Sequence, residues 1–134
     1  MTALPPDIAA AIARWPTPAK TAFRAIRDIL FRAAADQPAV GALTETLKWG
    51  EPAYLTAASK SGTTVRLAWK PATPAHLSVL LHCRTTLIGE LRDIYPHTFI
   101  YQGTRAALVR LDAPLPLAPL DHLARMAQMY HRRA

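Results

Sequence analysis

The sequence contains few of the residues that build the commonest specialised sites. Its single cysteine, Cys83, excludes an intramolecular disulfide and a thiolate-rich zinc centre, which favours a reducing compartment. Its five glycines form neither a G-x-G-x-x-G pattern nor a Walker loop, which excludes the common phosphate-binding signatures. No aliphatic run approaches the about 20 residues that cross a bilayer, and the N-terminus has no secretion leader. We therefore expect a soluble, cytoplasmic protein without a membrane segment.

The histidines and serines form no recognisable local site. His76 and His82 share one face of an expected strand but lie about 20 Å apart, too far for one metal ion. His122 and His131 are nine residues apart on an expected helix, which places them on opposite sides. No serine stands in a G-x-S-x-G elbow. The sequence thus indicates no catalytic residues and no metal ligands, and it favours a non-enzymatic protein without a cofactor.

The composition is that of one foldable domain that spans residues 1–134. Apolar residues make up 51% of the chain and charged residues 19%, so the chain needs no disulfide or metal to fold. The net charge of +7 raises the alternative of a nucleic-acid partner. Lys20, Arg24 and Arg27 on one helix face, with Arg132-Arg133 near the C-terminus, would serve that role. A solvated helix face is the plainer interpretation of the first three.

The hydrophobic periodicity predicts an α+β fold. A period of 3.6 residues predicts helices over about 5–15, 17–35, 87–95 and 120–133, with a short helical bridge between 38 and 45. A period of two predicts strands near 47–49, 53–56, 64–70, 76–83, 98–102 and 106–111. Ser61-Gly62 and Gln102-Gly103 read as turns, and Cys83 as a core residue. We expect a largely antiparallel five- to six-stranded sheet packed by N-terminal helices, a middle helix and a C-terminal helix.

One region combines aromatic side chains with charges and a glycine. Trp49, Tyr54 and Trp69 would form the walls of a cleft, a mixture typical of small-ligand sites. The candidate ligand-binding residues are Lys48, Trp49, Glu51, Tyr54, Trp69, Lys70 and His76. The alternative is that these aromatics belong to the core and that the charges mark exposed strand ends.

The same region resembles the YdhG-like family of small bacterial domains of unknown function. The resemblance rests on Leu47-Lys48-Trp49-Gly50-Glu51-Pro52-Ala53-Tyr54, on His76-Leu77-Ser78-Val79-Leu80-Leu81 and on Thr98-Phe99-Ile100-Tyr101, and it extends over about 18–130. It implies an α+β fold with an antiparallel sheet. Some members of that family are described as frataxin-like intracellular iron chaperones, so the resemblance makes iron delivery an alternative function. Frataxin-like iron binding relies on exposed carboxylates, whereas this chain has nine acids and a net charge of +7.

The sequence therefore leaves three functions open, beside an enzyme whose reaction it does not indicate. The first is binding of a small ligand or a protein partner at the aromatic and lysine cleft, the second is iron delivery, and the third is a nucleic-acid accessory role. The sequence does not distinguish a monomer from a homodimer.

Overall fold

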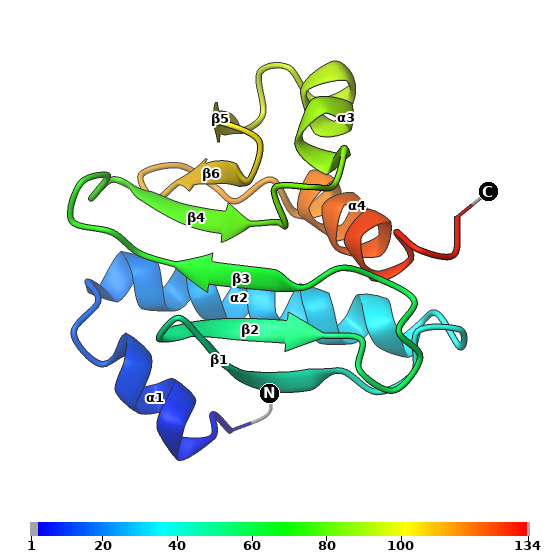
Figure 1. Cartoon of the computed structure of the whole chain (residues 1–134). Helices are drawn as coiled ribbons and strands as arrows, with labels where there is room; N and C mark the ends of the chain where they lie inside the picture. The colour runs from blue at the N-terminus through cyan, green and yellow to red at the C-terminus, as the bar shows by residue number, and fades with distance from the viewer. Residues whose placement is uncertain (1–2, 134) are drawn as a thin grey trace.

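The computed structural model describes residues 3–133, which form four helices and six strands (Figure 1). In chain order the elements are α1 (Pro6–Ile12), α2 (Thr17–Ala35), β1 (Thr44–Lys48), β2 (Glu51–Leu55), β3 (Val65–Ala68), β4 (His76–Leu80), α3 (Leu87–Ile94), β5 (Ile100–Gln102), β6 (Ala106–Arg110) and α4 (Leu117–Gln128).

The six strands form one antiparallel sheet in the order β1-β2-β3-β4-β6-β5. The first four follow chain order, and the connection through α3 carries the chain to the far edge, where β5 and β6 form a hairpin. The turn expected at Gln102-Gly103 joins these two strands, with Gly103 at a φ of 58°. The expected α+β class with a largely antiparallel sheet is therefore confirmed.

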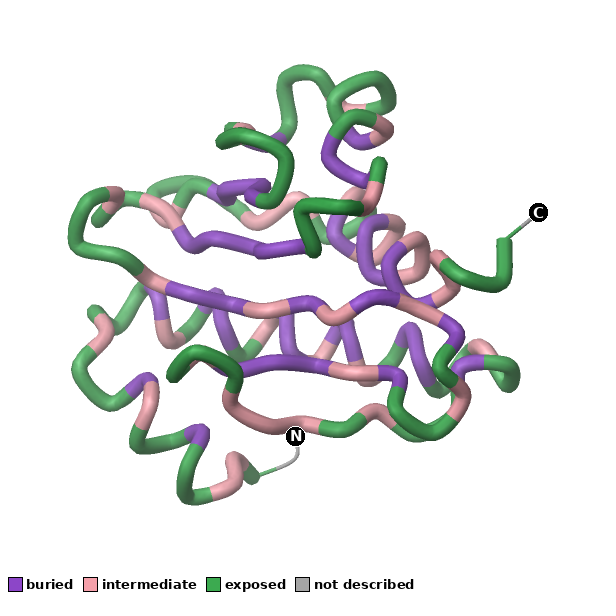
Figure 2. The backbone as a smooth tube through the Cα atoms, in the orientation of Figure 1, coloured by how far each residue is buried: buried purple, intermediate pink, exposed green. Residues whose placement is uncertain are grey.

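One face of the sheet carries the main core, against which α2 and α4 pack (Figure 1). The apolar stripe predicted for α2 is buried there, including Phe23, Ile26 and Leu30. Val65 and Leu67 point into the same core from β3 because alternate strand residues face the same way. Burial is concentrated along the strands and the inner sides of these two helices, while most connections are exposed (Figure 2).

We call the other side of the sheet the open face, because Figure 1 views it without α2 or α4 in front. A small second cluster of Ala68, Leu80, Ala106 and Leu108 lies on it and is itself buried. The strand register adds the longer polar side chains to this face. They are Thr44, Thr46, Lys48, Glu51, Arg66, His76, Gln102 and Arg110.

Several boundaries differ from the sequence expectations. The bridge between 38 and 45 is not helical, and β1 begins within it at Thr44. The strand expected over 76–83 ends at Leu80, because the next residues turn around His82, whose carbonyl accepts hydrogen bonds from Thr85. Cys83 lies in that turn and is exposed, so its expected core position was wrong. The C-terminal helix ends at Gln128 rather than near 133.

Candidate functional site

The tip of the β1–β2 hairpin carries the most exposed large apolar side chain described in the protein. Lys48 pairs with Glu51 across the hairpin, which leaves Trp49 and Gly50 as a two-residue turn. Both have positive φ, 55° and 75°, as the tight hairpin turn of type I′ requires. Glycine adopts this conformation without strain, whereas tryptophan does so at a cost of about 1–2 kcal/mol. Trp49 is 90% exposed, so no packing of its side chain within residues 3–133 offsets that cost.

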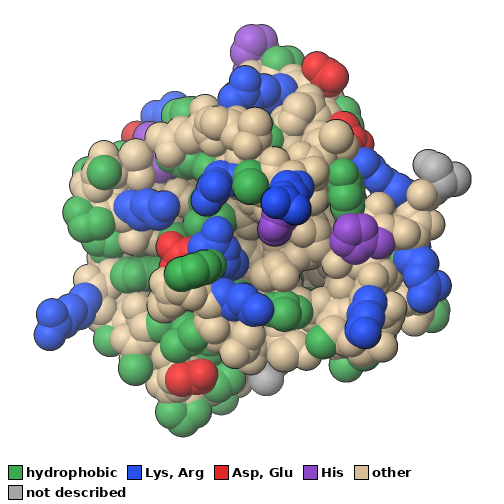
Figure 3. All heavy atoms as spheres, in the orientation of Figure 1, with side chains coloured by type: hydrophobic (Ala, Val, Ile, Leu, Met, Phe, Trp, Pro, Cys, Tyr) green, Lys and Arg blue, Asp and Glu red, His purple; other side chains and the backbone are tan. Residues whose placement is uncertain are grey.

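The sheet topology places three further basic residues at the same end of the sheet as this turn. Strands β1, β2, β3, β4 and β6 are neighbours in the sheet, so the β1–β2 turn, the end of β3, the start of β4 and the end of β6 lie at one end. Lys70 follows β3, and His76 at the start of β4 pairs with Arg110 at the end of β6. We call the set Lys48, Trp49, Lys70, His76 and Arg110 the hairpin end of the sheet. Figure 3 shows many more basic than acidic side chains over the face to which it belongs.

The two lysines of the hairpin end carry uncompensated charge. Across residues 3–133 every ion pair uses an arginine and none uses a lysine. Arg110 differs, since its guanidinium holds Asp112 at 2.9 Å and 3.0 Å. This contact holds the pKa of Asp112 below its usual range, with a smaller contribution from His76. At the hairpin end, Lys48 and Lys70 are therefore the Lys and Arg side chains that form no ion pair within residues 3–133.

Glu51 lies beside this end, but its charge is already compensated. Its carboxylate accepts a hydrogen bond from Arg66 on β3 at 2.5 Å, and each side chain is about one-fifth exposed. The pair holds β2 to β3 on the open face. Glu51 thus supports the hairpin end rather than offering a free carboxylate.

Tyr54 lies on the opposite side of the sheet, in the main core. Only 2% of it is exposed, and its hydroxyl donates a hydrogen bond of 2.8 Å to Glu45. Glu45 also accepts two hydrogen bonds from Arg27, whose guanidinium lies over the Phe31 ring. Burial and the neighbouring carboxylate raise the pKa of Tyr54. Burial raises the pKa of Glu45, but the hydrogen bonds from Arg27 and Tyr54 outweigh it and lower that pKa overall.

Arg27 is consequently a buried residue, not part of an exposed basic helix face as the sequence suggested. Of the three cations assigned to that face, Arg24 is exposed and Lys20 half-buried. At the C-terminus both arginines are exposed, but Arg133 is held by Glu90 through two hydrogen bonds of 2.7 Å, whereas Arg132 forms no ion pair within residues 3–133.

Trp69 is half-buried against the main core and donates its indole N–H to the carbonyl of Pro74 at 3.1 Å. It therefore fixes the loop between β3 and β4. The structure does not unite the seven predicted residues in one cleft. It groups Lys48, Trp49, Lys70 and His76 at the hairpin end, places Glu51 beside them, and assigns Tyr54 and Trp69 to packing.

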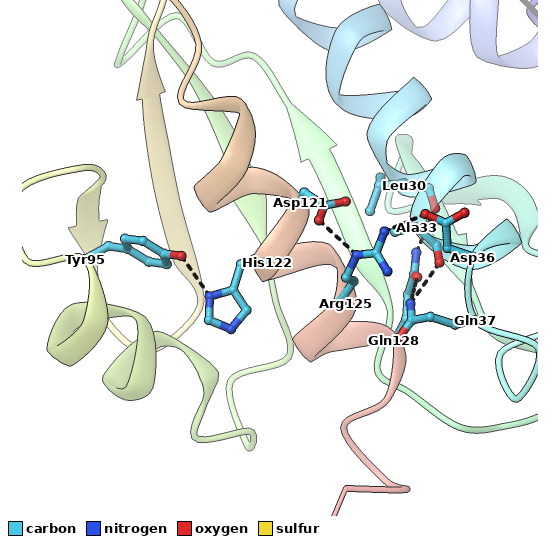
Figure 4. Close-up of polar contacts among 9 residues, drawn as sticks. All are labelled: Leu30, Ala33, Asp36, Gln37, Tyr95, Asp121, His122, Arg125 and Gln128. Atoms are coloured by element: carbon cyan, nitrogen blue, oxygen red, sulfur yellow. Dashed lines mark hydrogen bonds and ion pairs between the residues drawn. The ribbon is translucent and has the colours of Figure 1, made fainter.

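A second polar region lies between the helices and serves to hold them together (Figure 4). Arg125 on α4 contacts Asp121 at 2.9 Å and reaches Asp36 at the end of α2 at 2.8 Å. The buried Gln128 amide donates to the carbonyl of Leu30 and accepts from Gln37. The polar side chains of this region are bonded to one another or to the backbone of α2, which favours a structural role for the region.

A further contact in the same view joins α3 to α4. The Tyr95 hydroxyl and His122 Nδ1 are 2.8 Å apart, and the two rings meet edge to face (Figure 4). This pair extends the interhelix contacts rather than opening a site.

The acids of the protein are largely engaged by arginines. Six of the nine form ion pairs, namely Asp36, Glu45, Glu51, Glu90, Asp112 and Asp121. Within residues 3–133 no group of three or more His, Cys, Asp or Glu side chains is placed to hold a metal ion.

Sequence reasoning did not single out Arg110 or Lys60. Arg110 joins the hairpin end because β6 inserts beside β4, a pairing that the sequence does not reveal. Lys60 adopts a φ of 56° in the loop after β2. The only hint of this conformation in the sequence was its position directly before the predicted turn at Ser61-Gly62.

No helix within residues 3–133 is long and apolar enough to cross a membrane. Comparison of the chain with protein-family models, curated proteins and solved structures found no match.

Proposed function

We propose that this protein is a non-enzymatic docking domain that binds an acidic protein segment at the hairpin end of the sheet. The observation that carries the proposal is Trp49, which the β1–β2 turn holds 90% exposed in a left-handed backbone conformation. Strain of this kind persists where the surroundings enforce it, and it is concentrated at functional positions. Buried tryptophans are also among the strongest anchors of protein interfaces, often contributing about 2 kcal/mol or more.

The charge around Trp49 favours an acidic partner. Lys48 precedes it directly, and Lys70, His76 and Arg110 follow along the same end of the sheet. The lysines have no ion-pair partner within residues 3–133, so a carboxylate-rich segment would meet cations that are not yet neutralised. The net charge of +7 would accelerate the encounter with such a partner.

A protein partner fits this surface better than a small molecule. Small-ligand sites are concave and bury about 70–90% of the ligand surface. Trp49 instead projects from a hairpin tip, and Trp69, the second expected wall, is occupied by the main core and Pro74. A projecting aromatic suits insertion into a pocket of another protein.

A protein partner also fits better than single-stranded nucleic acid. Sheets that bind single strands stack bases on aromatic side chains across the sheet face. Along strands β1–β6, the open face carries no Trp, Tyr or Phe, since Tyr54 and Tyr101 both pack on the main core. Iron delivery is less well supported, because most acids are engaged by arginines.

The proposal places the protein in the cytoplasm, in line with its single cysteine. It agrees with the resemblance to YdhG-like domains, which are small bacterial proteins without an assigned reaction, and that resemblance stays a prediction from the sequence.

The test is a fluorescence titration with a synthetic peptide of aspartate, glutamate and leucine. We expect saturable quenching that weakens with salt, because the lysine contacts are exposed. Trp49→Ala should abolish the signal and lower the affinity about tenfold or more, as expected for an anchor residue. Trp69→Phe should keep most of the signal.

Two controls identify the results that would contradict the docking proposal. A neutral peptide with Gln and Asn in place of the acids isolates the charge contribution, and Lys20→Ala removes one positive charge from α2, away from the site. Equal weakening by Lys20→Ala and Lys70→Ala would reduce the interaction to non-specific attraction. Tighter binding of a single-stranded thymidine oligonucleotide than of the acidic peptide would replace this proposal with the nucleic-acid alternative.

A further inference from the structure

A second basic region lies at the opposite end of β2 from Trp49. There the surface forms a hollow of about 260 Å³. Its lining residues are Leu55, Thr56, Ala57, Lys60, Gly62, Thr64 and His131. Figure 3 shows a hollowed area on the C-terminal side of the molecule with basic and histidine side chains around it.

The loop that forms this hollow is firmly attached to the end of α4. Ser61 Oγ donates to the carbonyl of Gln128 at 2.7 Å, and Thr63 N donates to the carbonyl of Ala127 at 2.8 Å. Gly62 lies so close to α4 that an added Cβ would be 2.2 Å from the Ala127 oxygen. The amide of His131 in turn donates to the carbonyl of Ser61 at 2.8 Å. Loop and C-terminal segment therefore hold the hollow in one shape.

Within this fixed loop, Lys60 adopts an unusual backbone conformation. Its φ is 56°, and its amide donates to the carbonyl of Thr56 at 2.7 Å. A lysine gains nothing locally from the left-handed region, where glycine would be unstrained. With Trp49, it is one of two non-glycine residues with positive φ within residues 3–133. The sequence thus has a lysine at a position whose backbone conformation favours glycine.

The polar groups of the hollow suit an oxyanion. Lys60 and His131 are its ionisable lining residues, no acid lines it, and the exposed Arg132 follows His131 directly. Thr64 adds a hydroxyl for which no hydrogen bond is formed within residues 3–133, whereas the Thr56 hydroxyl is already bonded to Gly62. An ammonium group and a free hydroxyl can both donate hydrogen bonds to a phosphate oxygen.

The hollow has room for a small ligand. Pockets for drug-sized ligands span about 300–1,000 Å³, so a volume of about 260 Å³ lies just below that range and accommodates a phosphoryl group. We propose that the hollow bounded by Lys60, Thr64 and His131 is a binding site for one phosphoryl group, either free phosphate or a phosphate monoester. The site is separate from the hairpin end, so either proposal can fail without the other.

The cations have a competing role as neighbours of the C-terminus of α4, where positive charge is stabilising. The carbonyls of Ala127 and Gln128 already accept hydrogen bonds from Thr63 and Ser61. These carbonyls therefore gain less from a positive charge at Lys60. Removal of the Lys60 amine distinguishes the two roles. If the amine stabilises the end of α4, its removal lowers the stability of the fold. If it binds a phosphoryl group, its removal lowers the affinity for phosphate.

The experiment follows the amide NMR spectrum during titration with inorganic phosphate, and separately with O-phosphoserine, at constant ionic strength set by chloride. We expect saturable shifts centred on Thr64, Gly62 and His131. Lys60→Gly removes the amine but suits the observed φ, so the fold should be retained, as a thermal melt would verify. It should weaken binding about tenfold or more, the usual effect of losing a charge-assisted hydrogen bond. Lys60→Arg should restore most of the affinity.

Lys20→Ala serves as the control of equal charge change. Similar affinity for phosphate and phosphoserine would show that the phosphoryl group alone is recognised, and tighter phosphoserine binding would identify an esterified ligand. Shifts spread evenly over the basic surface, no saturation, or unchanged affinity in Lys60→Gly would each overturn the proposal.

Discussion

The contact among Arg27, Glu45 and Tyr54 joins α2 to the edge of the sheet, and its removal should cost much of the stability. The Arg27 and Glu45 side chains are only 4% and 8% exposed. Glu45→Ala removes the carboxylate that accepts from Arg27 and from Tyr54, leaving a buried positive charge without its main acceptor. Breaking one side of a buried ion pair costs about 3–5 kcal/mol, against a typical domain stability of about 5–15 kcal/mol.

The assay is urea denaturation followed by circular dichroism, with thermal melting beside it. For a chain of this length the loss corresponds to a fall in Tm of roughly 10–20 °C. Asp112→Ala is the matched control, since it breaks an arginine pair whose side chains are 62% and 64% exposed, and we expect no measurable loss there. A loss below about 1 kcal/mol in Glu45→Ala, the usual value for a surface pair, would refute the reasoning.

The same contact sets a pH dependence. The pKa of Glu45 is lower in the folded protein than its ordinary value of 4.5, so its contribution is present above pH 4.5 and is lost as the pH falls through the folded pKa. The stability difference between the native protein and Glu45→Ala should therefore shrink on acidification below pH 4.5. Urea midpoints of both proteins across this range would test it, and a constant difference would contradict it.

Two further substitutions test how α4 is fixed. Gly62→Ala should destabilise the protein by about 1–3 kcal/mol, because its methyl group would collide with the Ala127 carbonyl, a rigid backbone atom; an unchanged urea midpoint would disprove that close approach. Gln128→Leu should cost about 1–3 kcal/mol, since it removes the hydrogen bond that the Leu30 carbonyl accepts from Gln128 and one of the two that the Gln37 amide donates. Thermal melting would measure it, and a stabilised variant would show that these groups find water instead.

The sequence was sufficient where the structure follows local periodicity. The stripe of Phe23, Ile26 and Leu30 on α2 and the alternation of Val65 and Leu67 in β3 were predicted because helix and strand each repeat at a fixed interval. The β5–β6 turn was predicted for a similar reason, since Gly103 permits the positive φ that the turn requires.

The sequence failed where contacts join distant segments. Arg27 has the spacing of an exposed helix face, and only the partner Glu45, eighteen residues later, makes its burial favourable. Tyr54 and Trp69 had the composition of a binding cleft, yet sheet alternation turns both towards the main core. Trp49 was expected at the end of a strand and in the wall of a cleft, whereas its 90% exposure depends on a turn geometry that the residue types alone do not fix.

The most direct test of the docking proposal is to map the acidic peptide on the protein by amide NMR. The account predicts that saturable perturbations centre on Lys48, Trp49 and Lys70 and that Trp49→Ala removes them while the rest of the spectrum stays native. Perturbations centred on α2 or on the Lys60 hollow, or a binding surface unchanged in Trp49→Ala, would contradict it.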